Sequence, residues 1–362
     1  MKKNYNFSAG PAMLPKAVLK EVKNDLYNWK GLDRSVMEIS HRSKYFMNFI
    51  EETEYNLRTL LNIPNNYKVL FCQGGARGQF SAIPMNLLSH ISNMPDYINS
   101  GYWSKLAGIE AARYCNPHII DVRKKKNKKI FILPMSEWKI KLNTAYIHYC
   151  PNETIDGIAI REDPNFSSKI IIGDFSSTIL SYQINIKNYG IIYASAQKNI
   201  GPSGITVIII RDDLLISSKN LVPSILSYRV LYENNSMFNT PPTFSWYLSG
   251  LVFKWLIKIG GIKKIQEINK KKALLLYQTI DNSAFYFNNV HDNNRSYMNV
   301  PFKLHNTHLT KMFLKEAYNN GLYDLRGHSA VGGCRASIYN AMPIAGVKKL
   351  VQFMLYFKDQ YS

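Results

Sequence analysis

The sequence has few cysteines, no long apolar run and no clustered metal ligands. Its four cysteines form no close pair and no zinc-type spacing, which argues against a disulfide framework and for a reducing compartment. The eight histidines form no His-x-x-x-His pair beside a carboxylate, so we expect no metal site. No apolar run approaches the roughly 20 residues that a membrane-spanning helix needs, and the N-terminus lacks the apolar core of a signal peptide. These absences predict a cytoplasmic protein without a membrane partner.

Acidic residues are also scarce, because 25 Asp and Glu stand against 45 Lys and Arg, for a formal net charge of +20. Such a balance can indicate a nucleic-acid or anionic-membrane partner. Here, however, lysine outnumbers arginine 33 to 12 beside abundant Asn, Ile and Tyr, as an AT-biased genome produces at unconstrained surface positions. The densest basic run, 123–129, contains no aromatic residue for base stacking and is expected in a loop. We therefore expect no nucleic-acid partner.

Longer helical patterns alternate with short apolar runs along most of the chain. The apolar residues have helical spacing over about 14–29, 41–62 and 246–259, and the last pattern ends at Gly260-Gly261. Short, nearly continuous apolar runs are typical of a mostly parallel sheet that is covered by helices. Such runs occupy 68–72, 145–150, 170–173, 191–196 and 205–210.

This organisation predicts an α/β protein of two domains, since the chain is too long for one ordinary core. We expect a large domain over 16–259 with a mostly parallel central sheet flanked by helices. A smaller C-terminal α+β domain is expected over 260–362, where helical segments mix with short strand candidates such as 297–302. The extended N-terminal arm, 1–15, is expected to pack with the small domain.

One lysine has unusual neighbours. The apolar run 191–196 leads into Gln197 and Lys198, after which the chain turns through Gly201-Pro202-Ser203-Gly204. Small residues beside the amine leave space for a planar ring. A lysine at the mouth of a parallel sheet is partly desolvated, which lowers its pKa and makes it a usable nucleophile. An edge lysine beside a turn is the plainer interpretation, and this segment alone does not exclude it.

A second strand candidate supplies a carboxylate. The run 170–173 ends in Asp174, which begins a small polar turn. Pyridoxal phosphate acts as an electron sink only while its ring nitrogen is protonated, and a fixed carboxylate maintains that state. Two strands that end in Asp and Lys, at the ligand-binding edge of an open sheet, supply the required pair. The alternative role for Asp174 is a helix N-cap.

Two further features suit a bound phosphate and a flat ring. The glycine-rich segment 73–78 follows the run 68–72, and the first N–H groups of the next helix would point at an anion there. The segment lacks the Gly-Lys-Ser/Thr of a P-loop and is not a dinucleotide fingerprint. Trp103, expected in a turn, has an indole that can stack on a ring, although a core tryptophan would look the same.

These four features, in this order, resemble the class V branch of the fold-type-I aminotransferases, which use pyridoxal phosphate. The likeness to the phosphoserine aminotransferase family is closer still and runs from about residue 4 to the end without a large gap. The segments that carry it are 6–15, 40–42, 71–80, 148–158, 174–180, 197–204, 236–243 and 332–341.

The resemblance implies a role for each matching position. Lys198 is expected to hold the cofactor as a Schiff base and to move the substrate's Cα proton, while Asp174 keeps the ring nitrogen protonated and Trp103 stacks on the ring. Because two cofactor contacts come from the other subunit in this family, the active site is expected to need a homodimer. The other implied cofactor contacts are Thr154 at the ring hydroxyl, Ala76, Arg77 and Gln197 at the phosphate, and Asn239 and Thr240 at that phosphate from the second subunit.

For the substrate, Arg335 matches the arginine that binds the α-carboxylate, a task that suits its rigid bidentate fork. The implied reaction is a reversible, ping-pong amino transfer between 3-phosphoserine and 2-oxoglutarate, with a parallel reaction on 4-phosphohydroxythreonine in vitamin B6 synthesis. An ordinary surface salt bridge for Arg42 and a helix cap for His328 are the alternatives. The group that matches the site for the substrate's phosphate or side-chain carboxylate is His41, Arg42, Arg77 and His328.

Two other functions are weighed against this one. A related class V enzyme, such as a cysteine desulfurase, would use Cys334 as its nucleophile, but it needs a thiol on a mobile loop. Loss of all turnover in Cys334→Ser would favour that enzyme. A non-catalytic basic binding protein would bind random DNA in a salt-sensitive way and would lack the cofactor's absorbance.

Two positions depart from the family pattern. Ser329 stands where the family usually has another arginine, and Ala9 replaces a serine often found near the substrate carboxylate, which leaves only a main-chain contact there. Arg326 lies close to Ser329 in sequence. The phosphate pocket should therefore have lost one positive charge.

We predict that Ser329→Arg lowers the Michaelis constant for the phosphorylated substrate and largely preserves turnover, because it restores a charge-assisted contact to phosphate. Steady-state kinetics with phosphoserine measure both constants. An unchanged Michaelis constant would show that Ser329 does not weaken phosphate binding.

Overall fold

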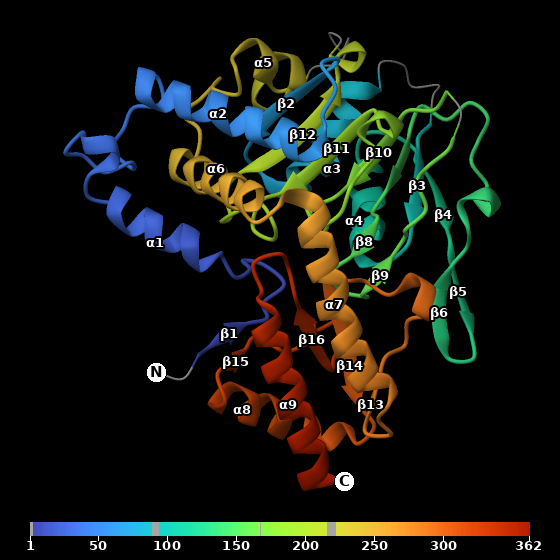
Figure 1. Cartoon of the computed structure of the whole chain (residues 1–362). Helices are drawn as coiled ribbons and strands as arrows, with labels where there is room; N and C mark the ends of the chain where they lie inside the picture. The colour runs from blue at the N-terminus through green and yellow to red at the C-terminus, as the bar shows by residue number, and fades with distance from the viewer. Residues whose placement is uncertain (1–2, 89–93, 167, 216–221) are drawn as a thin grey trace.

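The computed structural model describes residues 3–88, 94–166, 168–215 and 222–362, so the first two residues of the predicted N-terminal arm lie outside it. Figure 1 shows a large upper part built on a twisted sheet and a smaller lower part formed by the C-terminal third, with the extended N-terminal segment beside it. Within the described residues, no helix is long and apolar enough to cross a membrane.

A seven-stranded sheet forms the centre of the large part. Only β12 runs antiparallel, to both of its neighbours, and the other paired strands are parallel. The reversal follows from the sequence, because the turn after Lys198 returns the chain directly beside β11. In spatial order the strands are β2 (Tyr67–Cys72), β12 (Thr206–Arg211), β11 (Ile191–Ser195), β10 (Ile171–Asp174), β7 (Ile147–Tyr149), β3 (Asp96–Asn99) and β4 (His118–Asp121).

Both faces of this sheet are covered by helices, as its nearly continuous apolar strands require. Along β2, Val69 and Phe71 pack with the cluster that includes α1, α2 and α6, whereas Leu70 and Cys72 pack on the opposite side with α3, α4 and α5. Figure 1 shows α2 and α6 lying side by side across the sheet. These helices are α1 (Lys16–Asp25), α2 (Lys44–Leu61), α3 (Gly75–Leu87), α4 (Tyr102–Ala111), α5 (Tyr228–Glu233) and α6 (Thr243–Lys258).

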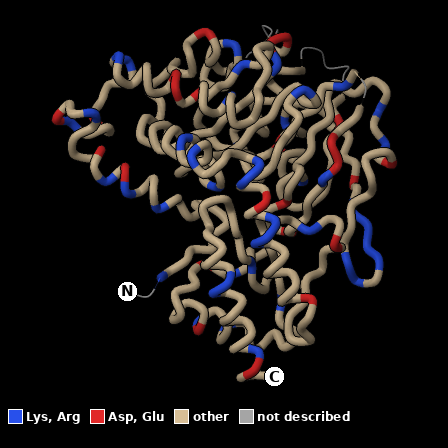
Figure 2. The backbone as a smooth tube through the Cα atoms, viewed as in Figure 1, with Lys and Arg blue, Asp and Glu red and all other residues tan. Residues whose placement is uncertain are grey.

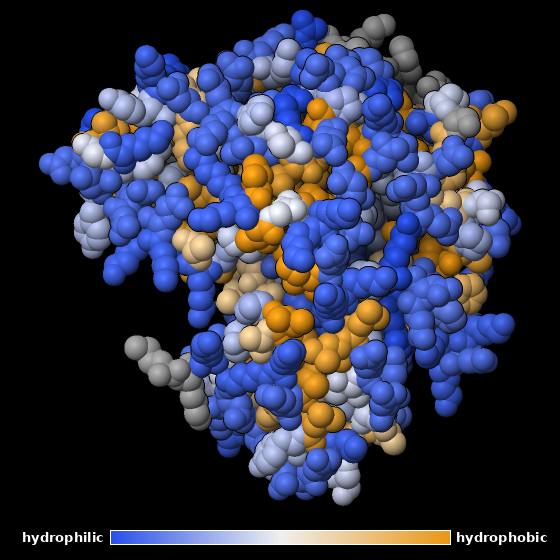
Figure 3. All heavy atoms as spheres, in the orientation of Figure 1, coloured by the Kyte–Doolittle hydropathy of each residue, from blue (hydrophilic) through white to orange (hydrophobic). Residues whose placement is uncertain are grey.

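The C-terminal third has its own apolar core, built on a three-stranded antiparallel sheet. The N-terminal β1 (Tyr5–Asn6) pairs in parallel with β15 (Leu322–Tyr323), which ties the first residues to this part. Apolar side chains gather on the surface where α7 meets α9 (Figure 3), including Leu274 and Leu355. The other elements here are α7 (Gly261–Asp281), β13 (Tyr286–Phe287), β14 (Asn299–Leu304), α8 (Thr310–Asn319), β16 (Cys334–Ser337) and α9 (Ile344–Tyr361).

The predicted α/β class with a mostly parallel central sheet is confirmed. The apolar runs became β2, β7, β10, β11 and β12, and the helical pattern over 246–259 became α6, which ends before Gly260. The strands β3 and β4 were not predicted. The proposed division into domains at residue 260 stays a prediction.

The prediction of a loop at 123–129 is wrong. The segment forms a hairpin of β5 (Arg123–Lys126) and β6 (Lys129–Ile132), and Figure 2 shows its cluster of basic residues at the edge of the molecule. Three consecutive exposed lysines make up most of β5, so no alternation of apolar and polar residues marks it as a strand. A two-residue antiparallel pair, β8 (Asn152–Glu153) with β9 (Ile158–Ala159), carries the residues around Thr154.

We predict that Gly250→Ala lowers the free energy of unfolding by about 1–2 kcal/mol, although alanine is normally more stable than glycine inside a helix by about 1 kcal/mol. A Cβ at this position of α6 would lie 2.7 Å from the ring of Phe49 in α2. Urea unfolding measures the difference. Lys258→Ala, on the exposed side of α6, is the control and should change the free energy of unfolding by less than about 0.5 kcal/mol. A stabilised Gly250→Ala would contradict the close packing.

Candidate active site

A cavity of about 390 Å³ lies at the carboxyl ends of β7, β10 and β11, where open α/β sheets bind their ligands. It collects residues that are far apart in the sequence and combines one amine, one carboxylate and several hydroxyl groups. Its lining residues are Ala76, Trp103, Cys150, Asn152, Thr154, Asp174, Ser176, Ser177, Ser195, Gln197 and Lys198.

Lys198 lies in the turn that follows β11, and its Nζ donates a hydrogen bond to Thr154 Oγ1 at 2.7 Å. Burial lowers the pKa of Lys198 to about 8, although the negative charge of Asp174 acts in the opposite direction. The amine is therefore much more often neutral near pH 8 than an ordinary lysine, and a neutral amine is the nucleophilic form.

Asp174 is the last residue of β10 and pairs in register with Tyr193 of β11. Burial raises the pKa of its carboxyl group, while hydrogen bonds from Ser176 and the charge of Lys198 lower it. Asp174 Oδ1 accepts from the Ser176 amide at 2.9 Å. The carboxylate and the Lys198 ammonium thus each favour the charged form of the other in a partly dehydrated cavity.

The glycine-rich segment forms the start of α3, as its sequence predicts. Gly74 and Gly75 have φ values of +95° and +63°, a backbone region that few residues other than glycine enter. The Ala76 amide donates to Ser195 Oγ at 2.7 Å, and a Cβ on Gly75 would lie 3.2 Å from that oxygen. Backbone N–H groups at a helix N-terminus therefore face the cavity, an arrangement that suits an anion.

Trp103 was expected in a turn, and that placement is wrong because it lies in the first turn of α4. Its indole lies near both cations of the site: the Lys198 Nζ is 5.9 Å and the Arg77 guanidinium carbon 5.8 Å from the ring centroid. Its buried Nε1 has no hydrogen-bond partner within the described residues.

Sequence reasoning missed the residue that fixes this helix. The buried carboxylate of Glu153 accepts from the amides of Trp103 at 2.8 Å and Ser104 at 2.9 Å. A carboxylate at a helix N-terminus is favourable because it satisfies free N–H groups. Burial raises the pKa of Glu153 to about 7 despite these hydrogen bonds. In the sequence, Glu153 was only the residue before Thr154 in the segment 148–158, and nothing indicated this role.

The C-terminal third contributes Arg335 and His328 to this side of the molecule. Arg335 lies in β16, and burial lowers the pKa of its guanidinium group; its buried Nε has no partner in the described part of the chain. His328 packs against Tyr102, with ring centroids 5.2 Å apart. The imidazole accepts from the Ala330 amide at 3.2 Å, so it caps a turn and not a helix.

Tyr339, which sequence reasoning also missed, connects the C-terminal third to the N-terminal arm. Its hydroxyl donates to the Ala9 carbonyl oxygen at 2.9 Å and accepts from Asn299 Nδ2 at 3.0 Å. The Ala9 carbonyl oxygen is therefore bonded within the protein, and the expected main-chain contact of Ala9 with the substrate stays a prediction. Tyr339 lies in the matching segment 332–341, but an isolated tyrosine gave no sign of its contacts.

Seven predicted residues do not line the cavity in this single chain: Arg77, His328 and Arg335, described above, and four that lie on other segments. His41 and Arg42 precede α2, and Figure 1 shows the connection between α1 and α2 on the opposite side of the large part from β8 and β9. Arg42 is exposed and has no ion pair in the described ranges, so the alternative surface salt bridge does not form. Asn239 and Thr240 are exposed as well, and the Thr240 carbonyl accepts from Gln73 at 3.3 Å.

Cys334 does not suit the desulfurase alternative. The residue lies within β16 and is buried, and burial raises the pKa of its thiol to about 12. A reactive cysteine needs an accessible thiolate.

The cavity fits pyridoxal phosphate by the chemistry of its donor set. It offers an amine of lowered pKa, a buried carboxylate for a pyridine nitrogen, helix N–H groups for a phosphate, and an indole beside them. An ordinary surface lysine would not have a buried carboxylate, helix N–H groups and an indole beside it.

Comparisons with known proteins agree with this chemistry. The family model described as aminotransferase class-V matches residues 4–350. The phosphoserine aminotransferase of Buchnera aphidicola subsp. Schizaphis graminum is 63% identical over 358 residues, and the match covers 99% of each chain. The structure of phosphoserine aminotransferase from Bacillus circulans subsp. alkalophilus has a TM-score of 0.95 at 39% identity, with both chains fully covered. The PLP-bound enzyme from Trichomonas vaginalis has a TM-score of 0.92 at 38% identity, over 98% of this chain and all of that one.

We predict that, in the cofactor-free protein, Lys198 reacts with an amine-modifying reagent with a midpoint near pH 8, whereas ordinary lysines require about pH 10.4. Asp174→Asn should move the midpoint lower still, because the carboxylate raises the pKa of Lys198. Modification at a series of pH values, followed by peptide mass analysis, gives both midpoints. A higher midpoint in Asp174→Asn would contradict the proposed coupling of the two charges.

Proposed function

The chain belongs to the class V aminotransferases and, within them, to the phosphoserine aminotransferases, and we propose how its residues carry out the amino transfer. The enzyme exchanges an amino group between 3-phosphoserine and 2-oxoglutarate, in a reversible, two-stage reaction that uses pyridoxal phosphate. The observation that carries our proposal is the close grouping of Lys198, Thr154 and Asp174 in one cavity. Bound pyridoxal phosphate supplies the electron sink and the aldehyde carbon that accepts the amino group.

Lys198 is the catalytic base and acid. Its Nζ would hold the cofactor, and the amine moves the proton at the substrate's Cα by removing it and later returning one. A pKa of about 8 suits this role because the amine exchanges protons readily near neutral pH. Asp174 holds the proton on the pyridine nitrogen, and Thr154 bonds the ring hydroxyl side.

The other large-domain residues bind and orient the cofactor. The N–H groups of Ala76 and Arg77, at the start of α3, hold the phosphate together with Gln197. Trp103 covers the ring, and Glu153 fixes that tryptophan by accepting from its amide. Here we also divide the chain into the arm 1–15, a large domain 16–259 and a small domain 260–362, a division that the separate apolar cores support.

Arg335 binds the α-carboxylate that both amino acids and both keto acids carry. An arginine fork suits this task, and the buried Nε of Arg335 has no hydrogen-bond partner within the described residues. Arg77 and His328 form one side of the site for the substrate's phosphate or distal carboxylate. 4-Phosphohydroxythreonine, which carries the same two anionic ends, is a second substrate of this site.

The active enzyme is a homodimer, and His41, Arg42, Asn239 and Thr240 act in the site of the partner chain. Figure 1 shows the connection between α1 and α2, which contains His41 and Arg42, well away from β8 and β9, and this supports the arrangement for that segment. Large exposed apolar side chains in the segment 27–55 and beside Asn239 would be buried by a second copy. Those with at least 45% exposure include Tyr27, Met37, Tyr45, Tyr55 and Phe238.

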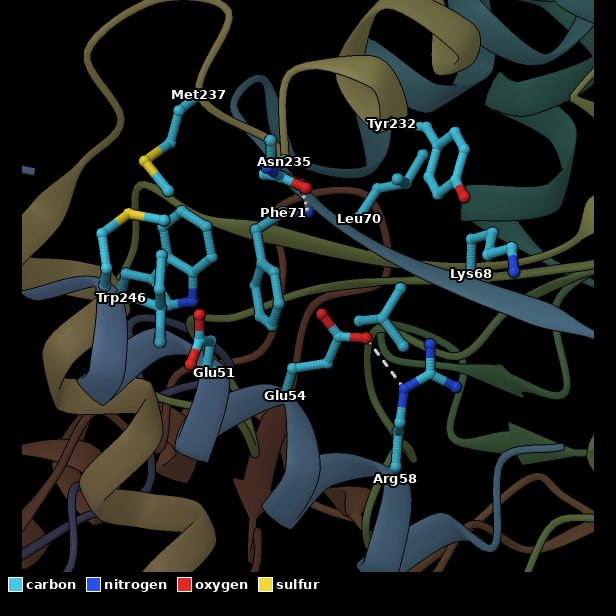
Figure 4. A pocket seen from close by; sticks show the side chains of 14 residues that line it. Glu51, Glu54, Arg58, Lys68, Leu70, Phe71, Tyr232, Asn235, Met237 and Trp246 are labelled. Atoms are coloured by element: carbon cyan, nitrogen blue, oxygen red, sulfur yellow. Dashed lines mark hydrogen bonds and ion pairs between the residues drawn. The ribbon is translucent and has the colours of Figure 1, made fainter. Parts of the chain in front are cut away.

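An open groove beside the edge strand β2 extends this surface (Figure 4). It has a volume of about 910 Å³, and Phe71, Met237 and Trp246 face it, with the Glu54–Arg58 ion pair along one side. The buried Trp246 Nε1 has no partner within the described residues. We assign this groove to the same dimer interface, and we place the enzyme in the cytoplasm because its four cysteines are free.

We predict that the purified protein has the visible absorbance of its bound cofactor and that phosphoserine bleaches it. Lys198→Ala should lose both the bleaching and at least about 10⁴-fold of turnover, because no other group in the cavity can move the Cα proton. The control Cys334→Ser should retain both. Bleaching by phosphoserine at an unchanged rate in Lys198→Ala would overturn the assignment.

We predict that mixing two inactive homodimers, Lys198→Ala and Arg42→Ala, restores activity after subunit exchange. If Arg42 acts in the partner's site, each mixed dimer contains one intact site, which gives about one quarter of the wild-type activity in a random mixture. Each variant refolded alone is the control. No gain above the controls would place Arg42 in the site of its own chain.

A further inference from the structure

Lys272 is a completely buried lysine in the middle of α7. Its Nζ donates to three main-chain carbonyl oxygens: that of Ile338 at 2.9 Å, that of Tyr339 at 2.7 Å and that of Met342 at 3.0 Å. No carboxylate pairs with it within the described residues. A buried cation that binds only backbone is costly unless its hydrogen bonds are complete, so its geometry requires an explanation.

The three acceptors favour the ammonium form. An ammonium group has three N–H donors, which match the three carbonyl oxygens, whereas a neutral amine has only two. Burial lowers the pKa of Lys272 to about 7, and the converging carbonyl dipoles oppose this effect. The Lys272 ammonium group thereby holds the segment 338–342 against the middle of α7.

This segment is the direct continuation of the strand that carries Arg335. Tyr339, whose carbonyl oxygen binds Lys272, also has its hydroxyl near the Thr154 side chain, and Thr154 accepts from Lys198. Lys272 is therefore linked to the reacting amine through two intervening side chains and to Arg335 through one short stretch of backbone.

A second connection leads to the residue after Lys198. The Asn340 amide donates to Asn199 Oδ1 at 3.0 Å, and Asn340 Nδ2 donates to the Leu180 carbonyl at 2.9 Å. Asn269, one turn before Lys272 in α7, donates to Asn340 Oδ1 at 2.8 Å. One face of α7 thus holds 338–342 against the turn that contains Lys198.

We infer that Lys272 is a positioning residue for substrate binding, which fixes the 338–342 segment so that Arg335 and Tyr339 keep their place relative to Lys198. The inference rests on the proposed role of Arg335 at the α-carboxylate. A rigid guanidinium fork tolerates little displacement, and misplacement by about 1 Å can cost roughly a hundredfold in rate. The phosphate contacts proposed at the start of α3 do not involve this segment.

The test compares Lys272→Met with Leu276→Ala in the holoenzyme. Methionine is similar in length but cannot donate to the three carbonyl groups, whereas Leu276 is one turn further along α7 in the apolar core. Lys272→Met should raise the Michaelis constants for both phosphoserine and 2-oxoglutarate by about tenfold or more, with a smaller loss of kcat and unchanged cofactor absorbance. Leu276→Ala should lower the melting temperature and keep both Michaelis constants within about twofold.

Asn269→Ala removes only the bond to Asn340 and a weaker one to Ser181, so it serves if Lys272→Met does not fold. It should raise the same two constants by about threefold or more. Unchanged Michaelis constants in a folded Lys272→Met, or in Asn269→Ala, overturn the inference. Failure of the wild-type protein to convert phosphoserine would instead overturn the proposed function, which keeps the two outcomes separate.

Discussion

The mutual dependence of Lys198 and Asp174 underlies the whole site. Each is partly removed from water, and each charge favours the ionised form of the other. Their placement requires two neighbouring parallel strands that end at the same edge of the sheet, which is why β10 and β11 pair in parallel. Burial then produces an amine that titrates near neutral pH, as proton transfer requires.

Much of the remaining structure supports the groups around this pair. Two glycines with positive φ bring the N-terminus of α3 to the cavity, and the buried Glu153 fixes the start of α4 and with it Trp103. Neither contribution involves a residue that reacts. Both use the free N–H groups of a helix start, one to face an anion and the other to bind a carboxylate of the chain.

The substrate side depends on how the C-terminal third meets the sheet. Asn340 joins the two parts through a buried hydrogen bond to Asn199, and Lys272 holds the segment 338–342 that contains Asn340. A shift of this third would move Arg335 but leave the proposed phosphate contacts at the start of α3 unchanged. The proposed dimer adds a second requirement of the same kind, since residues before α2 and after α5 act only beside another copy.

The sequence by itself determined the fold class and the pair at the strand ends. Apolar runs and glycine turns depend on local spacing, so the strands that lead to Asp174 and Lys198 could be recognised from the sequence. It could not reveal the hairpin at 123–132, because the consecutive exposed lysines of β5 hide the alternation that marks a strand. It also gave no sign of the roles of Glu153, Tyr339 or Lys272. Only the tertiary structure decided those roles, because each depends on backbone groups that folding brings together from distant parts of the chain, where burial makes an unpaired polar group costly.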